Sequence, residues 1–343
     1  MTALAAPPPV ALLQRGRLVG LLIAVLLLAV AVFLSFALGA RQVDLGAVLG
    51  GLFAPTGANT DQMVVRELRL PRTVIGVVAG AALALAGTVV QGLTRNPLAD
   101  PGLLGVNSGA SLFVVLGITF FGVSTVFGQI WFAFAGAAAA TVVVYLVSSG
   151  RSGPTPVTLT LAGAAVTAGI TSMITLLLLS NLETLNQYRF WAVGSLVGRQ
   201  LESVAVVAPF LLVGGVIALM LGRSLNVLSL SEDVARGLGE HIGRTRVLAS
   251  IAVVLLCGSA TALAGPIVFV GLVVPHVARR FVGPDYRWVL AYSLVLGPTL
   301  LVLADVLGRL IVLPGELEAG LVVAFVGAPV MVALVRSKRL GAL

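Results

Sequence analysis

Long apolar stretches, separated by short polar segments, run along almost the whole chain. A helix needs about 20 apolar residues to cross a bilayer, whereas strands of a transmembrane barrel would show short alternating segments, and the chain has no such alternation. The pattern predicts an all-α polytopic membrane protein with about ten transmembrane helices. The predicted spans cover residues 18–38, 72–93, 103–121, 126–148, 157–180, 203–222, 247–264, 266–282, 288–310 and 317–335.

The polar segments divide the chain. Residues 1–17 are rich in proline and alanine, and we expect them to be disordered, ahead of one transmembrane domain over 18–338 and a short tail over 339–343. Within that domain, residues 223–246 form the most polar long stretch. Its spaced leucines and valines predict one or two short amphipathic helices.

One polar break stands out near the start of the transmembrane domain. The segment RLPR, Arg69 to Arg72, precedes a helix of small apolar residues, which stops at NPLADP, Asn96 to Pro101. Proline and asparagine at this density favour a rigid turn rather than a continued helix. About forty residues thus contain a charged entrance, a span, a polar elbow and a further span. This order is typical of a pathway through a membrane.

A short internal similarity indicates a repeat. Gly80–Gly87 matches Gly258–Gly265 at six of eight positions. The predicted second and seventh spans, which contain these segments, would cross the bilayer in opposite directions. Spans two to five and seven to ten would then form an inverted repeat, an arrangement common in transporters.

Composition supports a location in the bilayer. The chain is 59% hydrophobic and 10% charged, with a mean hydropathy of +1.11, whereas soluble domains carry about 25% charged residues. The net charge of +8 comes from arginines scattered among loops without interleaved aromatics, which argues against nucleic-acid binding. With both termini cytoplasmic, fourteen of the 21 lysines and arginines lie inside. This bias predicts a multi-pass protein of the cytoplasmic (inner) membrane.

Several kinds of chemistry lack the residues they need. The single cysteine, Cys257, lies in an apolar run, and two histidines without cysteine partners predict no metal site. No nucleophile–base group and no phosphate-binding Gly-x-x-x-x-Gly-Lys loop occurs, so we expect no enzyme and no ATP bound by this chain. Chains of intramembrane carboxylates, which ion-coupled carriers use, are also missing. Asp305 stands alone in its span, and its spacing from Arg309 predicts an ion pair.

The polar stretch offers an entry point for an external energy source. Residues 225–246 carry Val227, Leu228, Leu230, Val234 and Leu238, too many apolar side chains to leave in water without a partner. We therefore expect a cytoplasmic protein to dock there.

These motifs, in this order, resemble a known family. RLPR, Gly87-x-x-x-Gln91, NPLADPxLLGxxxGA, the segment ALAGPIVFVGLVVPHVAR at 262–279 and the closing ELEAGLVVAFVGAPVMVALV look like the permeases of type II (FecCD-type) ABC importers for iron-siderophores, haem and cobalamin. The resemblance covers about residues 18–338. It implies a pair of permeases, two cytoplasmic ATPases that bind ATP-Mg, an external substrate-binding protein, and no cofactor on this chain.

The resemblance also implies roles for individual residues. Arg69, Arg72 and Arg309 resemble the arginines that grip acidic residues of the binding protein, a geometrically specific pairing. Asn96 and Leu98 resemble residues of the cytoplasmic gate, whose other side would contain Pro156 and Val157, although small hydroxyl residues can occur at these two positions. The segment from Ser229 to Gly239 resembles coupling helices. The residues expected at the ATPase are Leu228, Leu230, Val234, Ala235, Leu238 and Gly239.

The substrate is inferred from one further segment. Residues 191–196, WAVGSL, resemble the siderophore branch of the family more than the cobalamin branch. The predicted function is ATP-driven import of ferric-siderophore complexes, with cobalamin or haem import as the alternative and an ion-coupled secondary carrier as a remote one. The particular siderophore, an identical or paralogous partner permease, and an unusual export direction stay open.

Overall fold

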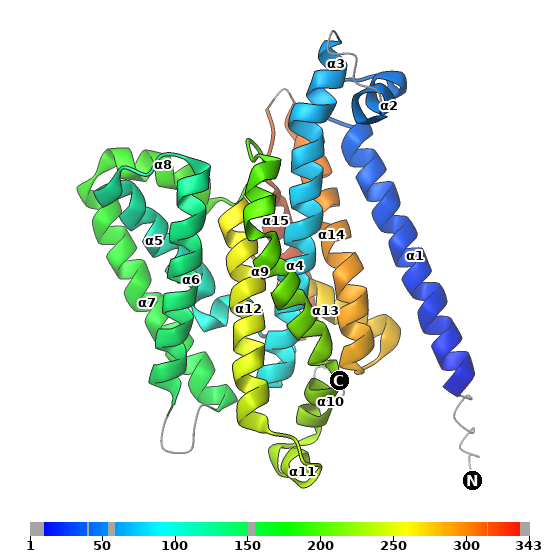
Figure 1. Ribbon diagram of the computed structural model, residues 1–343, viewed down its shortest axis with the longest axis vertical. Helices are drawn as coiled ribbons and strands as arrows, with labels where there is room; N and C mark the ends of the chain where they lie inside the picture. Colours follow the sequence, from blue (N-terminus) through cyan, green and yellow to red (C-terminus); the bar gives the residue numbers. More distant parts are fainter. Residues whose placement is uncertain (1–9, 40, 54–58, 150–154, 314, 337–343) are drawn as a thin grey trace.

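Every regular element in the described part of the chain is helical (Figure 1). The computed structural model describes residues 10–39, 41–53, 59–149, 155–313 and 315–336. The helices are α1 (Val10–Ala37), α2 (Leu45–Phe53), α3 (Thr60–Met63), η1 (Val64–Arg69), α4 (Leu70–Thr94), η2 (Pro101–Leu104), α5 (Val106–Phe121), α6 (Val126–Ser148), α7 (Pro156–Ser180), α8 (Leu182–Ala192), α9 (Leu201–Met220), α10 (Gly222–Leu230), α11 (Glu232–Gly237), α12 (Ile242–Ala264), α13 (Val270–Val282), α14 (Tyr286–Ile311) and α15 (Ala319–Arg336).

Helix α4 is the centre of the fold. Of the seven described helices that are long and apolar enough to cross a membrane, it belongs to the most enclosed segment, with 78% of its apolar window buried against 17% for α1. Small residues allow its neighbours to approach closely, since helices in lipid associate through packing. A Cβ atom on Gly80 would lie 2.6 Å from the carbonyl oxygen of Gly297 in α14, and one on Gly87 would overlap the backbone of α13 at Gly271.

The long helices run roughly parallel to one axis, with α2 and α3 at one end and α11 at the other (Figure 1). We call these the α3 end and the α11 end. Helices α5 to α8 gather on one flank of the centre, and α1 lies on the opposite flank against α14. Helices lie at all ten predicted positions, and α5 and α15 are apolar but shorter than the seven long ones.

The eighth predicted span is shorter than expected. Helix α13 has 13 residues and begins at Val270 rather than at residue 266. Gly265 and Phe269 have φ angles of 75° and 69°, which no α-helix accommodates, so residues 265–269 are irregular. At 1.5 Å per residue, α13 extends about 20 Å, less than the roughly 30 Å of a hydrocarbon core.

The start of the first helix also differs from the prediction. Residues 10–17, expected to be disordered, form the beginning of α1. Tertiary contacts stabilise this extension: Arg17 lies 3.8 Å from Asp285 and stacks over Trp288, and its carbonyl oxygen accepts a 2.7 Å hydrogen bond from Tyr292. Residues 1–9 and the predicted tail over 339–343 lie outside the described residues.

The two similar glycine segments lie on neighbouring helices that run in opposite directions. Helix α4 descends from the α3 end, and α12 returns from the α11 end (Figure 1). Their last glycines differ in role, because Gly87 lies within α4 whereas Gly265 caps α12 in a positive-φ conformation. The opposite directions fit an inverted repeat, which stays a prediction.

Candidate functional site

An arginine-rich pocket opens at the α3 end. Its volume is about 580 Å³, and the ionisable side chains that line it are five arginines and two glutamates. The excess of guanidinium groups favours carboxylate or other anionic partners. The ionisable lining residues are Arg41, Glu67, Arg69, Arg72, Arg199, Arg309 and Glu316.

Asp305 joins two of these arginines below the pocket. Its carboxylate accepts hydrogen bonds from Arg72 Nε at 2.8 and 2.9 Å and from Arg309 Nε at 3.0 Å, and it is only 1% exposed. Arg72 Nη1 also donates to Glu316 at 2.5 Å. The predicted Asp305–Arg309 ion pair is therefore confirmed, and Arg72 joins it from a position 233 residues away.

Arg69 and Arg309 donate hydrogen bonds to the carbonyl groups at the end of α1. The last carbonyl groups of a helix have no partner within it and carry partial negative charge. Arg69 donates to Phe36 and Ala37, and Arg309 donates to Ser35 at 2.9 Å. Both arginines thus anchor α1 against α4 and α14.

The structure brings the three predicted docking arginines together, but it buries them. Arg69, Arg72 and Arg309 are 5%, 8% and 2% exposed, and each has internal partners. They form the wall of the pocket rather than projecting from the surface, because α1 and α14 need their donors. Whether they contact a binding protein stays a prediction.

Two further arginines of the pocket were missing from the prediction. Arg199 follows α8, and its Nε atom is buried with no hydrogen-bond partner among the described residues. Burial lowers the pKa of Arg199, while the charge of Glu318 acts against that shift. Arg41 is exposed and pairs with Asp61 at 2.7 Å. In the sequence, Arg41 and Arg199 were recognisable only as arginines of polar loops predicted on the same side of the membrane as Arg69 and Arg72.

The predicted elbow ends α4 with an unusual backbone. Arg95 caps the helix in a left-handed conformation (φ 49°, ψ 33°), in which glycine is the usual residue. The Asn96 side chain accepts a 2.9 Å hydrogen bond from the N–H of Leu98 and closes a turn, and Asp100 caps η2 in the same way through Gly102. The elbow is therefore a rigid segment.

The other side of the predicted gate is the start of α7. Pro156 occupies the first position of this helix, after a capping box formed by Thr155 and Thr158, and Val157 is 67% exposed. Helix η2 of the elbow packs against α7. The helix that follows Asn96 and Leu98 is thus a neighbour of α7, and a gate formed with Pro156 and Val157 stays a prediction. Residues 150–154 of the preceding loop lie outside the described part of the chain.

The predicted coupling segment forms two short helices at the α11 end. Leu230, Val234 and Leu238 are 65%, 47% and 65% exposed, and Gly239 is exposed beside them with a φ of 81°. These three side chains form an apolar surface that water contacts unfavourably.

Two of the residues predicted at this surface lie behind it. Leu228 and Ala235 are buried and pack with Ile242, so they fix α10 and α11 to the start of α12. Helical spacing separates them from the exposed residues.

A buried polar contact escaped prediction. Arg279 of α13 donates to Gln91 of α4 at 2.6 Å, and its guanidinium group lies over the ring of Tyr286. The Gln91 amide in turn approaches the carbonyl oxygens of Gly271 and Leu272 at 3.4 and 3.3 Å. The glutamine of the Gly87-x-x-x-Gln91 motif therefore secures the short helix α13.

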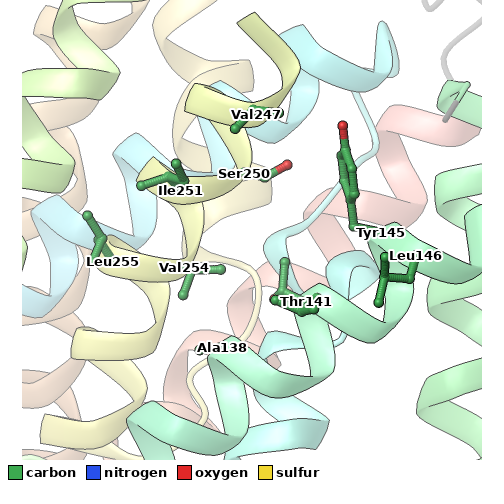
Figure 2. A pocket seen from close by; sticks show the side chains of 10 residues that line it. Ala138, Thr141, Tyr145, Leu146, Val247, Ser250, Ile251, Val254 and Leu255 are labelled. Carbon is green, nitrogen blue, oxygen red and sulfur yellow. The ribbon is translucent and has the colours of Figure 1, made fainter. Parts of the chain in front are cut away.

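A groove between α6 and α12 is apolar throughout its accessible lining. It measures about 270 Å³, and Figure 2 shows Val254 of α12 on the side that faces Thr141 and Tyr145 of α6. Such a lining suits hydrocarbon chains. Among the described residues, no group of three histidine, cysteine or acidic side chains could hold a metal ion.

Comparison with known proteins now identifies the family. The model of the FecCD transport family matches residues 27–337. The chain belongs to the FecCD transport family. It is 49% identical to the ferric enterobactin transport system permease protein FepD of Escherichia coli over 92% of this chain and 94% of the relative. It is 41% identical to the Fe(3+)-citrate import system permease protein YfmD of Bacillus subtilis over 95% and 97% of the two chains.

A solved structure supports the same assignment. An inward-facing conformation of a metal-chelate type ABC transporter superposes with a TM-score of 0.80 at 28% identity, covering 92% of this chain and 98% of that one. Together with the apolar helices, family membership makes the chain a multi-pass membrane protein of the inner membrane.

Proposed function

We propose that this chain is the permease subunit of an ATP-binding-cassette importer and translocates ferric-siderophore complexes. Its curated relatives include permeases for ferric enterobactin, iron(3+)-hydroxamate and Fe(3+)-citrate. The substrates in these names share iron(III) held by oxygen-rich organic chelators. Cobalamin and haem, the alternatives predicted from the sequence, are absent from the names of these three relatives.

The apolar surface of Leu230, Val234 and Leu238 supports the proposal that a separate ATPase docks on this chain and drives transport. This surface lies on short helices fixed to α12 by a small buried cluster. Exposed apolar groups of this kind gain free energy when a partner covers them. The partner would be the ATPase subunit, and the α11 end would face the cytoplasm together with the start of α1.

The arginine-rich pocket at the α3 end would then face the substrate-binding protein. Five arginines against two glutamates attract acidic groups, and electrostatic complementarity of this kind speeds and orients docking. Since Asp305 and α1 already occupy most donors of Arg69, Arg72 and Arg309, an incoming carboxylate would meet Arg199 and Arg41 first.

The complete transporter would contain two permeases, identical or paralogous, two ATPases and one binding protein. ATP-Mg would bind only on the ATPases, and this chain would carry no cofactor. The elbow at Asn96 and Leu98 and the start of α7 at Pro156 and Val157 would narrow the path at the cytoplasmic end. The packing of η2, which follows Asn96 and Leu98, against α7 supports this placement.

Reconstitution tests the proposal. The chain would be purified in mild detergent from its native membrane, its partners identified by mass spectrometry, and the assembly placed in proteoliposomes with ATP inside. Uptake of ferric enterobactin, ferric citrate, a ferric hydroxamate, haem and cobalamin would be compared. ATP-dependent uptake of a ferric chelate supports the assignment. Uptake of haem or cobalamin alone, or transport driven by an ion gradient without an ATPase, would overturn it.

A further inference from the structure

A cluster of four charged residues connects α11 with the elbow. Glu232, the first residue of α11, lies 2.5 Å from Arg246 Nη2 of α12, 3.3 Å from Arg95 Nη2 at the end of α4 and 3.5 Å from Arg236 Nη2. Its side chain is 25% exposed, and that of Arg246 is 10% exposed. One carboxylate therefore joins α11 both to α12, the next helix of the chain, and to the end of α4, which is far away in the sequence.

The contact with Arg95 reaches a strained position of the backbone. Arg95 has a positive φ, which is uncommon for residues other than glycine, and such conformations persist where surrounding contacts hold them. The N–H groups of Arg95 and Asn96 both bond to the carbonyl oxygen of Gln91. Holding the Arg95 guanidinium group therefore also fixes the direction in which the chain enters the turn at Asn96.

Helix α11 is well placed to transmit movement. Ala235 of α11 packs with Ile242 of α12, and Thr245 donates a 2.5 Å hydrogen bond to Glu240. The opposite face of the segment carries the exposed Leu230 and Leu238. A force on that face is therefore passed to the α11–α12 unit as a whole, and Glu232 is the charged contact between this unit and the end of α4.

We propose that Glu232 is a positioning residue that transmits movement of the docked ATPase through Arg95 to the elbow between α4 and α5. The inference rests on the proposed function, because it requires an ATPase on the exposed face of α11. Arg246 orients the carboxylate and compensates part of its charge. Loss of the carboxylate leaves the docking surface unchanged but separates ATP hydrolysis from movement of the elbow.

The test uses the complete transporter, with its ATPase and binding protein, in proteoliposomes with radio-iron-labelled ferric enterobactin. Glu232→Gln removes the charge and keeps the shape of the side chain. Asp233→Asn is the matched control, since Asp233 is the next residue of α11 and its side chain is 95% exposed. Arg95→Gln breaks the same connection from the other side, where the side chain is 30% exposed. Three quantities are measured: the ATPase recovered per permease, the rate of ATP hydrolysis, and the iron taken up per ATP.

With Glu232→Gln and Arg95→Gln, we expect full ATPase recovery and continued hydrolysis, while iron uptake per ATP falls at least about fivefold, the lower end of typical coupling between linked sites. The double variant should be no worse than either single one, and Asp233→Asn should match the wild type. A wild-type uptake ratio in the two single variants overturns the proposal, and so does selective loss of the ATPase from Glu232→Gln, which would make Glu232 a docking residue. Failure of the proposed function looks different, because the wild-type chain would then recover no ATPase.

Discussion

Replacing Asp305 by asparagine tests the buried network at the α3 end. The substitution keeps the side-chain size but removes the charge that both Arg72 and Arg309 contact, and these residues are 1%, 8% and 2% exposed. Arg72 would retain Glu316, whereas Arg309 would keep only neutral partners. Removing one partner of a buried ion pair costs about 3–5 kcal/mol, because the remaining charge stays buried. We expect Asp305→Asn to lower the free energy of unfolding by that amount.

The assay is unfolding of the purified chain by SDS in mixed dodecyl maltoside micelles, followed by circular dichroism. Asp61→Asn is the matched control at the same end, because Asp61 pairs with Arg41 at 2.7 Å but the two side chains are 32% and 57% exposed. Exposed pairs contribute about 0–1 kcal/mol, so the two variants should differ by about 2 kcal/mol or more. If Asp305→Asn costs no more than Asp61→Asn, the reasoning about the buried network is wrong.

Three further predictions concern packing, docking and the buried polar contact. Gly87→Ala places a methyl group in the backbone of α13, so we expect a cost of more than about 1 kcal/mol in the same SDS titration, with an unchanged value contradicting the close helix packing. Leu230→Asp combined with Leu238→Asp should abolish co-purification of the ATPase while the size-exclusion profile of the permease stays that of the wild type, and retained ATPase would argue against docking at this surface. Gln91→Leu removes the hydrogen-bond acceptor of the buried Arg279, and we expect the SDS titration to show a loss of about 1–3 kcal/mol, whereas no loss would mean that the contact is replaced.

Much of the architecture follows from the sequence alone, because its signals are local. About twenty consecutive apolar residues predict a span wherever the span packs, and proline with asparagine predicts the elbow at residues 96–101. The Asp305–Arg309 pair was predictable because residues four apart on a helix face each other. The apolar side chains of the polar stretch 223–246 also predicted short amphipathic helices there, because their spacing is visible in the sequence.

The tertiary structure decided everything that depends on which helices are neighbours. Arg72 contacts Asp305, which is 233 residues away in the sequence, and Gln91 contacts Arg279, which is 188 residues away. Helix periodicity relates only residues a few positions apart, so it predicts neither contact. The irregular backbone before α13 depends on a left-handed Phe269, which no local pattern favours.

The fold also decided which of the predicted docking residues are exposed and which are buried. Leu228 and Leu230 are two residues apart and equally apolar, yet only Leu228 packs against α12, because side chains two apart lie on different faces of a helix and only one face meets a neighbour. The docking arginines were recognisable by motif, but their burial was not, since it depends on α1 ending where Arg69 and Arg309 can donate to its last carbonyl groups. Hydrophobic period and charge determine the elements of this protein, and the packing between distant helices determines which of its polar groups remain free to act.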